Sequence, residues 1–170
     1  MTVAGGFLDA AVLVLIATGA LKLVEPGYTT VALRAMGLPS TAGLVRAGAA
    51  FEVLLGALTL TVGSPVLAAL VAASFAAFSL FVLAARCRGV PITSCGCLGW
   101  VDTPPTLRHV AITTIAAAGC VWAAVDDPEA LLDAFDRRPG AALGFLVVVA
   151  LVAAVALRLL IERPVARTRR

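Results

Sequence analysis

Charged residues are scarce in this sequence. Only 14% of its 170 residues are Asp, Glu, Lys or Arg, whereas an ordinary soluble domain has about 25%. Hydrophobic residues take their place at 61%, and the mean hydropathy is +1.04. A chain of this size cannot hide so much apolar surface in a water-soluble core. The composition excludes a disordered chain and indicates a membrane protein.

Several functional classes also lack the residues they need. Cysteine occurs four times, too rarely for a secreted disulfide scaffold. The net charge is only +3 and the basic residues do not alternate with aromatics, so we expect no nucleic-acid partner. The sequence has no Ser/His/Asp set, phosphate-binding loop or pair of catalytic carboxylates. Hydrolytic and phosphoryl-transfer chemistry is therefore not expected.

Five segments are long and apolar enough to cross a bilayer, which takes about 20 residues in a helix. They are residues 6–24, 44–62, 66–85, 104–125 and 141–160. The strict alternation of polar and apolar residues that is typical of a transmembrane barrel is absent. We therefore predict an all-α, polytopic transmembrane helical bundle with a four-helix core and a fifth C-terminal span.

The same pattern divides the chain into four parts: the four-helix membrane core at 1–125, an acidic surface loop with a short amphipathic helix at 126–138, the fifth transmembrane helix at 139–161 and a basic cytoplasmic tail at 162–170. Gly63-Ser64-Pro65 predicts a tight turn that makes the second and third spans antiparallel. Thr103 and Pro104 predict the N-cap and first turn of the fourth span. Residues 28–36 predict an amphipathic surface helix or, alternatively, an irregular loop.

The basic residues predict the orientation in the membrane, since cytoplasmic loops carry an excess of Lys and Arg. With five spans, the N-terminus and the two even-numbered loops lie on one side of the membrane. The basic residues on that side are Arg137 and Arg138. The other side holds Lys22, Arg34, Arg46, Arg86, Arg88, Arg108, Arg158, Arg163, Arg167, Arg169 and Arg170. We expect the N-terminus outside and the C-terminus in the cytoplasm.

The segment Cys95-Gly96-Cys97, between the third and fourth spans, carries the strongest chemical signal. Cysteines at i and i+2 in an extended chain have Cα atoms roughly 6 to 7 Å apart, near the upper edge of disulfide geometry. Gly96 lets the backbone bend and bring the sulfurs together. The small, strained ring that results exchanges readily. Arg86 and Arg88 could favour a thiolate. We therefore predict a redox-active dithiol.

Two other interpretations of the cysteines remain open. A Cys3His zinc site could form from Cys87, Cys95, Cys97 and His109. The two close thiolates of Cys95 and Cys97 could also hold Cu(I). The pair could also be inert packing. Cys87 could act as a resolving thiol or be a packed interfacial residue, while Cys120, deep in the fourth span, is expected in the core.

Glu52 lies near the middle of the second span, where an ionised carboxylate is costly and needs a partner. Lys22 is the best candidate, because its long stem can reach inward from the end of the first span; Arg46 is the second. Lys22 and Glu52 thus predict either an intramembrane polar site, for protons, a quinone or a lipid headgroup, or a structural ion pair.

Small and aromatic residues suggest how the helices pack. Gly19, Gly48 and Gly56 are expected to let helices approach closely. The aromatic residues Phe75, Phe78 and Phe81 recur at helical spacing. That spacing is typical of core or lipid-facing packing rather than of a cofactor site.

Several of these motifs, in this order, resemble the MauE branch of the MauE/DoxX-like membrane proteins. Gly19-Ala20-Leu21-Lys22 followed by Glu25-Pro26 resembles the family's Gly-x-x-Lys element at the end of the first helix. Glu52 and Gly56 match its Glu-x-x-x-Gly element. Cys95-Gly96-Cys97-Leu98-Gly99 resembles its Cys-Gly-Cys-Phe-Gly loop, with Leu98 in place of phenylalanine. Arg108-His109 resembles its Arg-Asn element. The resemblance covers roughly residues 10–125.

The resemblance implies a protein of the bacterial cytoplasmic membrane that takes part in thiol redox chemistry with a thioredoxin-like partner. The resemblance further implies that the protein supports disulfide formation or maturation of other proteins, with Cys95 and Cys97 as the reacting pair. A quinone is a possible cofactor, and membrane lipid and further copies of the chain are possible partners. A metal-handling protein and a non-catalytic anchor of a redox complex are the alternatives. The basic residues place the cysteines inside, whereas maturation of exported proteins would favour the outside.

Overall fold

The computed structural model describes residues 2–89, 106–128, 130–137 and 139–161, which form seven helices and no strand. Five of these helices are long and apolar enough to cross a membrane. The predicted all-α bundle with five spans is therefore confirmed. The spans are α1 (Val3–Val24), α3 (Ala42–Val62), α4 (Pro65–Cys87), α5 (Leu107–Val125) and α7 (Pro139–Ile161), and the two short helices are α2 (Gly27–Ala35) and α6 (Leu131–Arg137).

Local capping residues fix where several helices begin and end. Thr2 and Thr41 precede α1 and α3, and their hydroxyl oxygens accept hydrogen bonds from the backbone N–H groups of Gly5 and Leu44. Gly63 ends α3 in the left-handed conformation, with φ of 59°, and Pro65 opens α4 two residues later. The predicted antiparallel turn between these two spans is therefore present.

The start of α5 differs from the prediction. The helix begins at Leu107 with Thr106 as its N-cap, not at Thr103 and Pro104, which lie outside the described residues. The cap falls here because the side chain of His109 reaches back to Thr106 from the first turn. The order of the helices places this end of α5 at the same end of the bundle as the end of α4.

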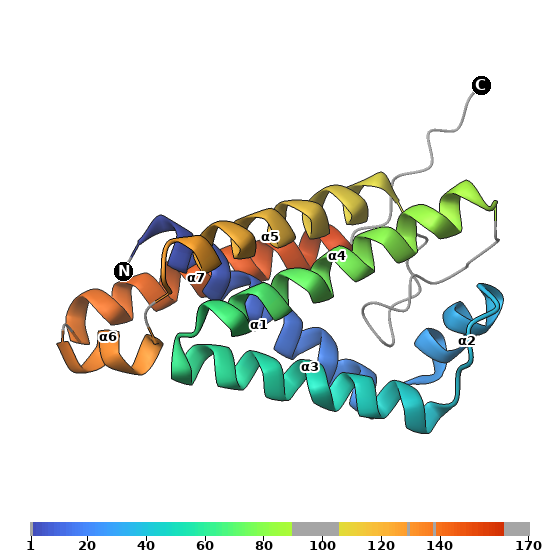
Figure 1. The fold of residues 1–170 in the computed structure, drawn as a ribbon, viewed down its shortest axis with the longest axis horizontal. Coiled ribbons are helices and arrows are strands. Elements are labelled where there is room, and N and C mark those ends of the chain that lie inside the picture. Colours follow the sequence, from blue (N-terminus) through green and yellow to red (C-terminus); the bar gives the residue numbers. More distant parts are fainter. Residues whose placement is uncertain (1, 90–105, 129, 138, 162–170) are drawn as a thin grey trace.

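α1 is the central helix of the bundle (Figure 1). In its most apolar window 50% of the residues are buried, compared with 17–33% in the other four spans. It packs along α3 on one side and along α5 and α7 on the other, while α4 and α5 form a second antiparallel pair. The core contains Leu15, Leu55, Phe75, Cys120 and Ala153, one residue from each span.

Two glycines bring α1 and α3 into close contact. A Cβ atom at position 19 would lie 3.0 Å from Val53 Cγ2, and one at position 56 would lie 2.5 Å from Ile16 Cγ1. Both predicted close approaches are therefore confirmed. The prediction for Gly48 is wrong: this residue is exposed and no atom lies within 4 Å of its Cβ position, because it points away from α1.

The short helices lie at opposite ends of the bundle (Figure 1). α2 forms a helix where the sequence left helix or loop open, and it docks through Ala32 against Ala85 of α4, with Met36 and Phe81 around them. α6 forms within the predicted acidic segment and packs against α7. The basic tail lies outside the described residues.

Candidate functional site

A buried ion pair joins the first two spans of the core. Lys22 Nζ lies 2.9 and 2.8 Å from the two carboxylate oxygens of Glu52, so the ammonium donates to both. The two side chains are only 4% and 14% exposed. Lys22 is therefore the partner expected from the sequence. Arg46, the second candidate, instead donates from Nε to the backbone oxygen of Leu23, at 3.2 Å, because it lies closer to the end of α1.

Phe78 of α4 completes the surroundings of the ammonium. Lys22 Nζ lies 4.3 Å from the centre of the Phe78 ring, within the range of a cation–π contact. The ring of Phe75 meets Phe78 edge-to-face, with centroids 6.3 Å apart. Sequence reasoning assigned this phenylalanine stripe to packing, which is correct for Phe75 but misses the electrostatic contact of Phe78. A pattern along one helix cannot reveal a cation supplied by another.

The next residue, Ser79, extends the polar contacts to α5. Its hydroxyl lies 2.7 Å from the hydroxyl of Thr114 and 3.4 Å from the backbone oxygen of Val110. We use the name polar layer for five residues from α1, α3, α4 and α5 that make these contacts: Lys22, Glu52, Phe78, Ser79 and Thr114. Four helices of the core thus meet at one level of the bundle through polar or cation–π contacts.

On α3 and α4 the polar layer lies far from the helix ends, whereas Lys22 precedes the end of α1 at Val24 by only two residues. Glu52 follows the start of α3 at Ala42 by ten residues, and Ser79 precedes the end of α4 at Cys87 by eight. At ~1.5 Å per residue, Glu52 and Ser79 lie about 15 and 12 Å along their helices from these ends, and the long stem of Lys22 carries its ammonium to the same level from the end of α1. A salt bridge at that depth avoids the cost of an isolated charge only while both partners are present.

His109 lies between the polar layer and the start of α5. Its Nδ1 accepts a hydrogen bond from the backbone N–H of Thr106 at 3.4 Å and lies 2.8 Å from the Thr106 hydroxyl. The backbone oxygen of His109 accepts from the hydroxyl of Thr113 at 2.7 Å. His109 is buried, with 3% of its surface exposed. This geometry makes His109 a residue that organises the first turns of α5.

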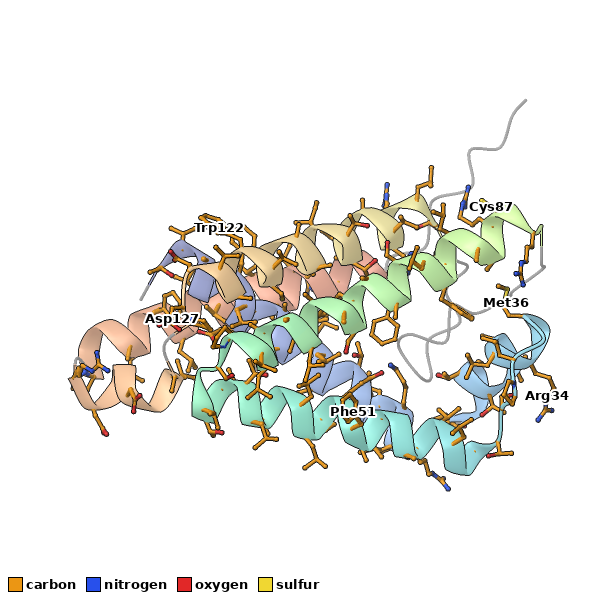
Figure 2. The ribbon with its side chains drawn as sticks, in the orientation of Figure 1. Arg34, Met36, Phe51, Cys87, Trp122 and Asp127 are labelled. Atoms are coloured by element: carbon orange, nitrogen blue, oxygen red, sulfur yellow. The ribbon has the colours of Figure 1, made fainter. Side chains whose placement is uncertain are left out.

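Cys87 is the last residue of α4 and is exposed. Arg86 and Arg88 flank it, in the last turn and at the C-cap of the helix. Figure 2 shows Cys87 at the same end of the bundle as Arg34 and Met36, whereas Trp122 and Asp127 lie toward the other end. A third thiol is therefore available at the point where the chain leaves α4 toward the cysteine pair.

Cys95 and Cys97 lie outside the described residues, as do Gly99 and Trp100. Within the described residues, no group of three His, Cys, Asp or Glu side chains could hold a metal ion. Cys120 is fully buried in the core, as expected.

The five spans and the polar layer define a polytopic, helical integral membrane protein. The chain belongs to the MauE family, since the family model described as methylamine utilisation protein MauE matches residues 4–126. The match covers α1 to α5 and ends one residue after α5, so α6 and α7 lie outside it. No curated protein and no solved structure matches the chain.

Proposed function

We propose that this protein is a membrane thiol–disulfide relay that reacts through Cys95 and Cys97. The observation that carries the proposal is the Cys-Gly-Cys segment itself, within the stretch matched by the MauE family and between two spans of its core. A disulfide across such a short segment is strained and therefore exchanges easily. The partner is a thioredoxin-like protein, whose dithiol is the natural reactant for such a disulfide.

The exchange moves two electrons and two protons from the partner to the pair. A thiolate of the partner attacks one sulfur of the Cys95–Cys97 disulfide and the other leaves as a thiolate, which gives a mixed disulfide. The second thiol of the partner then attacks the mixed disulfide. The partner leaves oxidised and the pair is left as a dithiol, so with the cysteines on the cytoplasmic side, as proposed below, the protein draws electrons from cytoplasmic thiols. A membrane quinone is the class of acceptor that takes up two electrons and two protons and so restores the disulfide.

Described residues support this chemistry from both sides of the cysteine segment. Cys87 is an exposed thiol at the end of α4 and could resolve a mixed disulfide. Arg86 and Arg88 place positive charge on both sides of Cys87, where the chain leaves α4 toward the cysteine pair. On the other side, His109 fixes the start of α5. In this proposal the Lys22–Glu52 pair is the intramembrane polar site at which the quinone acceptor binds and takes up protons.

Single serine substitutions test the relay. In a Cys87→Ser background, which removes the other exposed thiol, Cys95→Ser and Cys97→Ser should each leave one thiol of the pair, and one of the two should trap a mixed disulfide with a thioredoxin-like protein on a non-reducing gel. The matched control is Cys120→Ser, because Cys120 is buried in the core and should trap nothing. The relay is wrong if neither variant traps a partner. Loss of bound zinc or copper in the variants would favour a metal-handling protein. Retention of function in both variants would favour a non-catalytic anchor of a redox complex.

We also propose that the cysteine end faces the cytoplasm. The described arginines at that end are Arg34, Arg46, Arg86, Arg88, Arg108 and Arg158, whereas the described part of the acidic segment has Arg137 alone. A variant that retains only Cys87 provides an exposed reporter thiol. A membrane-impermeant maleimide should label it in opened membranes and not in intact cells. Labelling in intact cells would place the cysteines outside and contradict the orientation.

A further inference from the structure

An apolar groove runs along the seam between α7 and the family core. Its volume is about 160 Å³, and its walls come from α1, α4, α5 and α7. The hollow exists because α7 packs closely on α1 but touches α5 only slightly. Small side chains line it where larger ones would fill it, among them Ala11, Ala116 and Ala153.

The groove is suited to hydrocarbon and to little else. The only polar side chain in its lining is Thr113, whose hydroxyl already donates to the backbone oxygen of His109. Water needs two to four polar partners, so it has no stable position here. A quinone ring would likewise find no free donor for its carbonyl oxygens. A cavity of about 150 Å³ with such a lining accepts benzene, so this one accepts several methylene groups of a chain.

The groove is open to the surrounding lipid. Ile115 of α5 and Val152 of α7 stand at its two edges, 61% and 50% exposed, in helices long enough to span the bilayer. Phe7 also lines the groove, and its ring lies 6.4 Å from the ring of Trp122 near the end of α5. A half-exposed tryptophan at a span end is typical of the headgroup level. Phe7 therefore marks the end of the groove that is nearer the membrane surface.

Negative charge follows directly beyond that tryptophan. Asp126 is one helical turn after Trp122 and donates its backbone N–H to the Trp122 oxygen, and both Asp126 and Asp127 are exposed. The C-terminal end of α5 adds the negative end of its helix dipole. This position therefore attracts a headgroup that carries an ammonium group. It repels a headgroup with a net negative charge.

We infer that the groove between α1, α5 and α7 binds one acyl chain of a zwitterionic phospholipid with an amine headgroup, such as phosphatidylethanolamine. The chain fills the hollow and so becomes part of the contact between α7 and the core. The headgroup ammonium lies at Asp126 and Asp127. This inference does not depend on the thiol relay.

Photo-crosslinking of the full chain in nanodiscs tests the inference. Phosphatidylethanolamine with a diazirine in its acyl chain should attach mainly to Ile112, Ile115 and Val152. Leu54 of α3 and Leu80 of α4 are the reference positions, since they are 62% and 65% exposed but lie outside the groove. Unlabelled phosphatidylethanolamine should compete about fivefold better than phosphatidylglycerol, as expected for one surface charge.

Two substitutions on α7 test whether the preferential labelling depends on the groove or on the helix as a whole. Ala153→Leu fills the groove and should abolish the preferential labelling, whereas Ala154→Leu adds the same side chain on the exposed face and should retain it. If Ala153→Leu does not fold, the labelling pattern of the unchanged protein still decides. Equal labelling of groove and reference positions would overturn the inference. Displacement of the probe by a quinone or by a second copy of the chain, but not by phosphatidylethanolamine, would overturn it as well.

Discussion

The two faces of α1 are packed in opposite ways. Toward α3, Gly19 and Gly56 bring the helix backbones together, and the Lys22–Glu52 pair closes the contact. Toward α7 and α5, alanines leave the groove of about 160 Å³. The closed face lies within the MauE family match, and the hollow face forms where a helix outside that match is added. Specific contacts thus hold the core, while the seam with α7 relies on bulk apolar contact.

The largest expected effect comes from breaking the ion pair on the closed face. Lys22→Met leaves Glu52 buried without its cation, which should cost about 3–5 kcal/mol. Reversible unfolding by sodium dodecyl sulfate from mixed micelles measures this loss. The double variant Lys22→Met/Glu52→Leu removes both charges and should recover most of it. A loss of 1 kcal/mol or less in Lys22→Met, about the value of an exposed pair, would mean that water reaches Glu52.

A smaller effect is expected from separating the two backbones. Gly56→Ala places a methyl group 2.5 Å from Ile16 Cγ1, and such overpacking should cost about 1–3 kcal/mol in the same unfolding measurement. Gly48→Ala is the matched control on the same helix, because its Cβ meets nothing within 4 Å. That control should be neutral or stabilise by up to about 1 kcal/mol through helix propensity. Equal effects of the two substitutions would contradict the close contact at Gly56.

The smallest effect should come from the hydroxyl contact between α4 and α5. Ser79→Ala removes its hydrogen bond with Thr114, and bonds of this type inside membranes contribute about 0.6 kcal/mol. Ser74→Ala is the control, because the Ser74 hydroxyl bonds only within its own helix, to the Leu70 oxygen. A double-mutant cycle of Ser79→Ala with Thr114→Ala isolates the pair. A coupling energy of zero would remove Ser79 from the polar layer.

The spans, the turn at Gly63-Ser64-Pro65 and the Lys22–Glu52 pair could be predicted because each depends on strong local rules. A charge in an apolar segment demands a partner, and few cations were available. Gly48 shows the limit of the sequence, since its residue type is that of Gly19 and only the facing helix tells them apart. The groove depends on how far α7 stands from α5, a distance that neither helix's own pattern specifies.

The Lys22–Glu52 pair also bears on how the chain enters the membrane during synthesis. α3 has a mean hydropathy of 1.5, compared with 2.1 for α1 and 2.5 for α4, and it carries a carboxylate near its middle. An isolated α3 would therefore partition poorly out of the translocon. Because α1 is made first and supplies the cation, we expect pairing with Lys22 to help retain α3 in the bilayer.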